Sequence, residues 1–194
     1  MNENEGNLQE QEKNDKRQNL KYERNIKPTT DWGVEMARIL IVYDSRTSNT
    51  EKMALAVAEG ARRVKDVEVT LKKVSQTSLQ DLCTADGIIA GSPVYYGQMS
   101  GKLKTMFDES VKIHGKLDGK VGAAFTNSGG TATGAETTLL SIVEAMLVHG
   151  MIVQGRCDDK HYGAAAVGSP RGKDIESCRD LGERVANLVT RLKP

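Results

Sequence analysis

From residue 37 onward the chain alternates between short apolar runs and amphipathic stretches. Residues 37–43, ARILIVY, form a nearly continuous apolar run, which is typical of a strand buried on both faces of a parallel sheet. Apolar or alternating runs predict four further strands, at 67–74, 87–92, 119–128 and 150–155. Apolar residues at helical spacing predict amphipathic helices at 49–63, 99–113, 135–149 and 174–192.

Individual residues in these segments predict where two of the helices begin and which strand lies at the edge of the sheet. Asn49 stands at the start of the first helix and is a favoured N-cap residue. In the helix predicted at 99–113, Met99 is the first residue of the apolar face. The segment at 67–74 alternates and ends with lysines, which suits a strand at the edge of a sheet.

Strands that alternate with helices in this way are joined by right-handed crossovers. They form a parallel sheet that helices cover on both faces, so the sequence predicts a doubly wound α/β fold. In such folds ligands bind beyond the carboxyl ends of the strands, at the point where the strand order reverses. A site is therefore expected in the loops after the first, third and fourth predicted strands.

The composition indicates how the chain divides into a domain and a tail, and which broad classes of protein it fits. The 194 residues fit one domain at 37–194 and a tail at 1–36, because the first 36 residues are rich in Asn, Gln, Glu and Lys. Such a polar segment buries too little apolar area to offset the entropy of ordering, so we expect it to be mobile. The formal net charge of +1 disfavours a nucleic-acid binder.

The sequence also predicts a compartment. No apolar run approaches the roughly 18 to 20 residues of a membrane-spanning helix, and the N-terminus lacks the apolar stretch of a signal peptide. We therefore expect a cytoplasmic protein without membrane insertion. Cys83, Cys157 and Cys178 are odd in number and form no CxxC pair, which favours small buried side chains over a disulfide framework or a metal site.

The loop after the first strand is rich in hydroxyl groups. It reads DSRTSNT (44–50) and leads directly into a helix. Amides at a helix N-terminus have unpaired donors and a partial positive charge, and hydroxyls add neutral donors, so the loop suits a monophosphate. An ordinary capped turn would use the same residue types. A dinucleotide is disfavoured because neither a GxGxxG nor a Walker motif is present.

The two other loops offer an aromatic wall and a flexible edge. In GSPVYYGQMS (91–100), Tyr95 and Tyr96 stand between a proline and a glycine, which suits a flat heteroaromatic ring. The alternative is a tyrosine pair that fills a surface crevice. In TNSGGTATG (126–134), glycines permit close approach of the backbone and hydroxyls add donors; taken alone, this segment also suits a flexible linker.

A phosphate cradle, an aromatic wall and a glycine-rich edge are the parts that flavin mononucleotide (FMN) requires. On these residues the chain resembles the flavodoxin-like superfamily, and especially the WrbA-type NAD(P)H:quinone oxidoreductases, over residues 37–192. The resemblance rests on SRTSNTEKMALAVAEGA (45–61), GSPVYYGQMSGKLKTMFDES (91–110), GKVGAAFTNSGG (119–130), ETTLLS (136–141), HGM (149–151), HYG (161–163) and GERVANL (182–188).

The resemblance implies a five-stranded parallel sheet in the order 2-1-3-4-5, bound FMN, and roles for particular residues. The residues implied for the FMN phosphate are Ser45, Thr47, Ser48, Asn49 and Thr50. Those implied for the isoalloxazine ring are Pro93, Val94, Tyr95, Tyr96 and Gly97. Those implied for the other ring edge and the ribityl chain are Asn127, Ser128, Gly129, Gly130 and Thr131.

His149 matches a histidine that, in the family, reaches the flavin of a neighbouring subunit in a tetramer. At a helix end, a histidine also suits a C-terminal cap. The chain departs from the family near the nicotinamide and quinone pocket. Thr47 stands where an aromatic residue is common, and Ile113 and His114 stand near the position of a tryptophan. Cofactor binding is therefore a safer inference than substrate choice.

Three functions follow from this sequence. The first is an FMN-dependent oxidoreductase, a homo-oligomer that passes electrons from NADH or NADPH to a quinone-like acceptor, with Tyr95 and His149 in the substrate pocket and no side-chain nucleophile. The second is a flavodoxin-type electron shuttle. The 21 Lys and Arg against 18 Asp and Glu in residues 37–194 disfavour it, because shuttles that dock on basic partners need an acidic rim. The third is a binding module without flavin.

Overall fold

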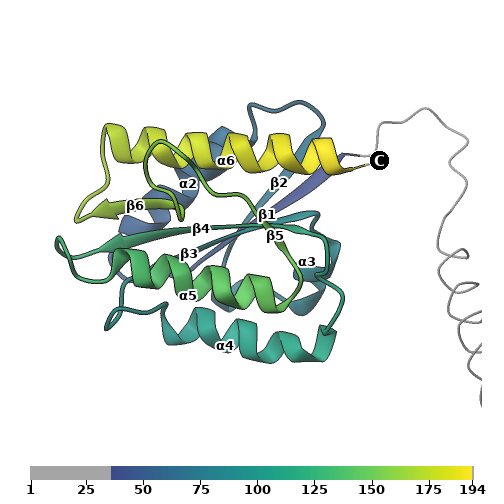
Figure 1. Ribbon diagram of the computed structural model, residues 1–194, viewed down its shortest axis with the longest axis horizontal. Coiled ribbons are helices and arrows are strands. Elements are labelled where there is room, and N and C mark those ends of the chain that lie inside the picture. Colours follow the sequence, from purple (N-terminus) through teal and green to yellow (C-terminus); the bar gives the residue numbers. More distant parts are fainter. Residues whose placement is uncertain (1–35, 194) are drawn as a thin grey trace, which may run out of the picture. The chain divides into compact units, whose positions relative to one another are not determined.

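The computed structural model describes residues 36–193, so the predicted tail at 1–36 lies outside the described residues except for Met36. The described strands form one parallel sheet (Figure 1). They are β1 (Ala37–Tyr43), β2 (Val67–Lys73), β3 (Gly87–Pro93), β4 (Val121–Ser128), β5 (Ile152–Val153) and β6 (Ala164–Val167). The order is β2-β1-β3-β4-β5, with β6 also paired to β4, which confirms the predicted flavodoxin-like order 2-1-3-4-5.

Helices cover both faces of this sheet, as predicted (Figure 1). One face packs against α2 (Asn49–Ala61) and α6 (Lys173–Leu192). The other packs against α3 (Leu79–Thr84), α4 (Gly101–Glu109) and α5 (Ala135–Val148), and two short 3₁₀ turns, η1 (Val74–Gln76) and η2 (Ser110–Ile113), extend β2 and α4. β1, β3 and β4 are almost wholly buried because both faces are covered. None of the helices within 36–193 is long and apolar enough to cross a membrane.

The last strand differs from the prediction. Instead of one strand at 150–155, β5 has two residues, and the chain loops out over 154–163 before β6 pairs with the far half of β4. Arg156 closes this loop, because its guanidinium contacts Asp158 at 2.6 Å and its carbonyl lies 2.8 Å from Nδ1 of His161. The short alanine-rich β6 has no distinctive apolar pattern, so the sequence analysis missed it.

Several local predictions need correction. The left-handed Ser48 (φ 62°) occupies the N-cap position of α2, so Asn49 is the first residue of the helix. Met99 is buried but precedes α4, because Ser100 caps that helix by accepting from the Leu103 amide at 3.3 Å. The short helix α3 was missed, although the capping box of Ser78 and Asp81 marks its start.

The cysteines also differ in part from the prediction. All three are free, and Cys178 is buried in the core as expected. Cys83 is only partly buried, and Cys157 is exposed on the loop before β6, so the prediction of buried side chains is wrong for Cys157.

Two glycines allow α2 and α6 to cross in backbone contact. A Cβ added to Gly60 would lie 1.9 Å from the carbonyl oxygen of Arg179, and one added to Gly182 would lie 2.0 Å from that of Val57. Around the crossing, Arg179 pairs with Glu59 at 2.9 Å. The close approach holds α2, and therefore the loop that leads into it, against the sheet.

We expect Gly60→Ala to destabilise the protein, because the added methyl group must force the two helix backbones apart. Overpacking of this kind costs about 1–3 kcal/mol, which chemical denaturation followed by circular dichroism would measure. Gly101→Ala is the matched control, since a Cβ there meets nothing within 4 Å. It should leave stability unchanged or raise it slightly, because alanine favours the helix. Equal stabilities of the two variants would contradict the close crossing.

Candidate cofactor-binding site

The loops after β1, β3, β4 and β6 all lie at the carboxyl edge of the sheet, because these strands are parallel and adjacent. The connections from β4 to α5 and from β6 to α6 lie at the left of Figure 1, where the arrowhead of β6 points. The structure therefore brings together the three segments singled out in the sequence. It adds a fourth, residues 168–172, which the sequence analysis missed together with β6.

The loop after β1 presents open hydrogen-bond donors. The hydroxyl oxygen of Ser45 is buried and has no hydrogen-bond partner among the described residues. The first amides of α2 have no partner inside the helix, and its first turn closes only where the Lys52 amide donates to the Ser48 carbonyl at 3.0 Å. Thr50 is buried at the start of this turn. A buried orphan hydroxyl beside open helix amides fits the phosphate of FMN.

The exposed residues of this loop surround the buried pair. Thr47 and Ser48 are exposed, and Asn49 is partly buried. No side chain caps the helix, so their polar groups do not block its amino terminus. The five residues predicted to bind phosphate are thus gathered around one helix end.

Two carboxylates flank the loop, and each is paired with a lysine. Glu51, in the first turn of α2, accepts a hydrogen bond from the Tyr43 hydroxyl at 2.7 Å and lies 3.3 Å from Nζ of Lys73. The Tyr43 hydrogen bond, together with Lys73, lowers the pKa of Glu51, whereas burial and Glu51 raise the pKa of Tyr43 to about 12. The buried Asp44 lies 3.9 Å from Nζ of Lys102. These lysines offset the repulsion that the carboxylates would exert on an anion.

The loop after β3 forms a tight turn whose tip is aromatic. The Tyr95 amide donates to the Gln98 carbonyl at 3.0 Å, and the Gln98 amide donates back at 3.1 Å. Tyr96 (φ 51°) and Gly97 (φ 77°) are both left-handed, as in a type I′ turn. This backbone costs a non-glycine residue about 1–3 kcal/mol. Tyr96 is fully exposed at 107%, so the alternative of a pair filling a crevice does not apply to it.

The loop after β4 is fastened to the loop after β3. The Val94 amide donates to the Asn127 carbonyl at 2.9 Å, and the Thr137 hydroxyl donates to the Gly97 carbonyl at 2.7 Å. A Cβ on Gly134 would lie 2.6 Å from the Cα of Gly97, so the two loops touch through their glycines. These contacts join the loops into one surface, which disagrees with the flexible-linker alternative.

Two of the predicted side chains in this loop have structural partners. The Asn127 amide nitrogen donates to the Gly168 carbonyl at 2.8 Å, and the Ser128 hydroxyl donates to the Gly130 carbonyl at 2.9 Å. They tie the end of β4 to its own loop and to the loop after β6. Gly129 and Thr131 are exposed and Gly130 is partly buried, so a ligand would meet backbone groups and the Thr131 hydroxyl here.

His149 is the predicted site residue that the structure does not bring to this edge. It is the C-cap of α5, and the next residue, Gly150, accepts from the Gly119 amide just before β4, at the amino edge of the sheet. Its Nε2 lies 2.7 Å from the Ser110 hydroxyl, while its Nδ1 is buried without a hydrogen-bond partner in the described part of the chain. Burial, and then the neighbouring His114, lower the pKa of His149.

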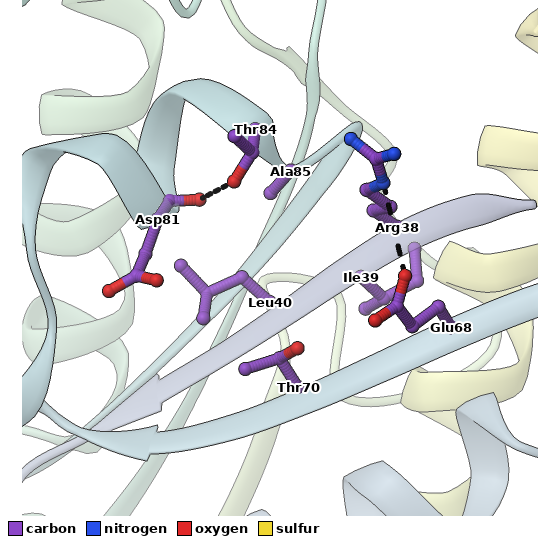
Figure 2. Close-up of a pocket in the computed structure, with 8 residues that line it drawn as sticks. All are labelled: Arg38, Ile39, Leu40, Glu68, Thr70, Asp81, Thr84 and Ala85. Carbon is purple, nitrogen blue, oxygen red and sulfur yellow. Dashed lines mark hydrogen bonds and ion pairs between the residues drawn. The ribbon is translucent and has the colours of Figure 1, made fainter.

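Two hollows lie outside the set of predicted site residues. Figure 2 shows a polar groove of about 340 Å³ between the start of β1, β2 and α3, where Arg38 pairs with Glu68 at 3.9 Å. A more apolar groove of about 470 Å³ lies between η1, the start of α3 and α4. Neither is lined by a predicted site residue.

Comparison with known proteins identifies the family of the chain. Residues 37–157 match the family model of NADPH-dependent FMN reductases. A flavodoxin from Aquifex aeolicus is 41% identical over 162 residues, which cover 79% of this chain and 88% of that protein. An NAD(P)H dehydrogenase (quinone) from Archaeoglobus fulgidus is 35% identical over 191 residues, which cover 81% of this chain and 100% of that protein.

The solved structures include a close match to the fold. The flavodoxin, WrbA-like protein from Agrobacterium tumefaciens superposes with a TM-score of 0.71 at 31% identity, covering 81% of this chain and 99% of that one. The fold and these comparisons together define a flavodoxin-like protein of an FMN-binding oxidoreductase class. Within that class, the chain belongs to the NADPH-dependent FMN reductase family and is similar to WrbA-type proteins.

The partly buried His149 makes stability depend on pH. Its pKa is lower in the folded protein than in the unfolded chain, so both states are neutral above the unfolded value of about 6.5, and the unfolded chain takes up the proton first as the pH falls. We therefore expect the wild type to lose more stability between about pH 7.5 and about pH 5 than His149→Asn, measured by urea denaturation. A His149→Asn profile parallel to that of the wild type would contradict this origin.

Proposed function

We propose that the protein is an FMN-dependent oxidoreductase that passes electrons from NADH or NADPH to a quinone-like small molecule. The observation that carries the proposal is the unpartnered Ser45 hydroxyl at the open amino terminus of α2, on the same edge as the fastened loops after β3 and β4. The family description and the quinone-dehydrogenase relative support it.

In this proposal each loop holds one part of the cofactor. The phosphate is bound by Ser45, Thr47, Ser48, Asn49 and Thr50. The isoalloxazine ring lies against Pro93, Val94, Tyr95, Tyr96 and Gly97. The other ring edge and the ribityl chain meet Asn127, Ser128, Gly129, Gly130 and Thr131. The side chains and the carbonyls of Asn127 and Ser128 are hydrogen-bonded within the protein, so these two residues shape the edge that the ligand meets.

When bound, FMN supplies the electron chemistry, and the protein supplies position and electrostatics. Backbone amides of the loop after β4 stabilise negative charge that develops along the adjacent ring edge. Tyr95 fixes the ring orientation and lines the pocket for the substrate. Because the edge is open, the donor and the acceptor reach the ring from solvent.

A flavodoxin-type electron-transfer protein is the second candidate, and the flavodoxin relatives favour it. The charge distribution disfavours it, since residues 37–194 hold 21 Lys and Arg against 18 Asp and Glu. A flavin-free binding module is the third candidate. The open donors around Ser45 disfavour it, because a buried hydroxyl without a partner has an energetic cost that a ligand would remove.

A single preparation separates these candidates. The absorption spectrum of the purified protein should show bound flavin, and steady-state assays should show oxidation of NADH or NADPH with benzoquinone as acceptor. Bound flavin without turnover would favour the electron shuttle. A colourless protein that takes up no added FMN would favour the binding module.

A cytoplasmic location is part of the proposal. All three cysteines are free in the structure, as is usual in a reducing compartment, and a quinone reductase needs the intracellular supply of NADH or NADPH.

We expect Ser45→Leu combined with Thr50→Val to abolish FMN retention while the fold persists, because two donors are lost and the cradle is filled. Flavin content after gel filtration measures the loss, and far-ultraviolet circular dichroism checks the fold. Ser75→Leu combined with Thr77→Val, in and just after η1, is the control and should retain flavin. A yellow cradle variant would refute the assignment.

We also propose a homo-oligomer, a dimer or a tetramer, in which His149 approaches a flavin held by another subunit. Its position at the amino edge of its own sheet supports a role between subunits, because it is remote from its own loops. His149→Ala should weaken FMN binding and slow quinone reduction without unfolding the protein. Sedimentation that shows a fully active, flavin-saturated monomer at micromolar concentration would remove this role.

A further inference from the structure

The tip of the loop after β3 is an aromatic side chain without a packing partner. Tyr96 is fully exposed at 107% and sits in a left-handed backbone that disfavours residues with a Cβ. Val167, at the end of β6 on the same edge, is 50% exposed. A rigid exposed tyrosine is a common anchor of protein interfaces, so this tip is shaped for contact with another molecule.

Cations without ionic partners lie on loops and helix starts at the same edge of the sheet. Arg46 lies in the loop after β1, Lys52 in the first turns of α2, and Arg171 and Lys173 at the start of α6. All four are exposed, and none has an ionic partner among the described residues. Lys102 adds a side chain that is 68% exposed, although it contacts the buried Asp44.

Carboxylates at the same edge are mostly neutralised. Asp174 lies 3.8 Å from Nζ of Lys160, and Glu51 lies 3.3 Å from that of Lys73. Glu136, in the first turn of α5, is an exposed carboxylate at this edge and has no ionic partner within residues 36–193. The carboxyl edge therefore carries a net positive field, although the whole chain has a formal net charge of only +1.

The cations are spread more widely than one small anion requires. Arg46 follows β1 and Arg171 follows β6, and β1, β3, β4 and β6 are successive neighbours in the sheet. Three steps of about 4.8 Å separate the outer strands by about 14 Å, with the Tyr96 turn between them. An apolar centre with a charged rim of this width has the anatomy of a protein interface.

We propose that the carboxyl edge is a docking face for a small redox protein with an acidic surface. The centre of the face is Tyr96, and its rim is Arg46, Lys52, Lys102, Arg171 and Lys173. The redox nature of the partner rests on the proposed function, because the face surrounds the edge where the flavin would be reached. Its charge is opposite to the acidic rim of a shuttle that docks on basic partners.

Binding measurements on the full-length, flavin-loaded protein test this face. An acidic plant-type [2Fe–2S] ferredoxin is the probe, and basic cytochrome c is the comparison protein. We expect the ferredoxin to bind in about 20 mM NaCl and to bind roughly 10-fold more weakly in about 200 mM, because salt screens exposed charges. Cytochrome c should bind at least about 10-fold more weakly than the ferredoxin in low salt.

Matched charge reversals locate the face. Arg171→Glu with Lys173→Glu should weaken ferredoxin binding about 10-fold in low salt. Arg62→Glu with Lys65→Glu, exposed residues just after α2 at the amino edge, make the same change in net charge and should alter the affinity less than about 2-fold. Tyr96→Ser, compared with the wild type at equal flavin content, should also weaken the complex.

These measurements distinguish failure of the docking face from failure of the proposed quinone reductase function. Equal losses in both charge-reversed pairs, tighter binding of cytochrome c, or no ferredoxin binding in low salt would each overturn the docking face. NADPH oxidation with benzoquinone is measured on the same samples. If that activity is absent while ferredoxin binding follows the expected pattern, the quinone reductase proposal fails and the docking face stands.

Discussion

Parallel pairing of β1, β3 and β4 is the constraint on which the site depends. These strands are buried on both faces, so their backbone hydrogen bonds must be satisfied within the sheet and their register is fixed. Because the strands point the same way, the loops that follow them emerge together. Close packing enforces the spacing: the Phe125 ring occupies the space above Gly91, where a Cβ would lie 2.0 Å from its ring atoms.

The polar interactions around the loops divide into two sets. Hydrogen bonds from Val94, Asn127 and Thr137 are used inside the protein to hold the loops after β3 and β4 in one arrangement. The Ser45 hydroxyl and the first amides of α2 are left open instead. An edge that is rigid and yet has unsatisfied donors is preorganised for an anionic ligand, since binding requires little further ordering.

The distribution of charged side chains also favours an anionic ligand at this edge. Carboxylates next to the α2 amino terminus are paired with lysines, whereas several cations on the rim have no ionic partner among the described residues. The same field that favours a phosphate close to α2 extends outward over the face that would meet a larger partner. Small-molecule turnover and protein docking therefore place compatible demands on one edge.

The sequence by itself determined the fold class, because the apolar runs of β1, β3 and β4 and the amphipathic helices between them follow strong periodic patterns. It also pointed to the loops of the candidate site, since hydroxyl, glycine and tyrosine residues cluster there. Only the tertiary structure decided how strand five divides into β5 and β6, because the second half is stabilised by pairing with β4 rather than by its own pattern. Long-range contacts likewise fixed which donors stay open, why Asn127 is occupied, and why His149 lies at the opposite edge.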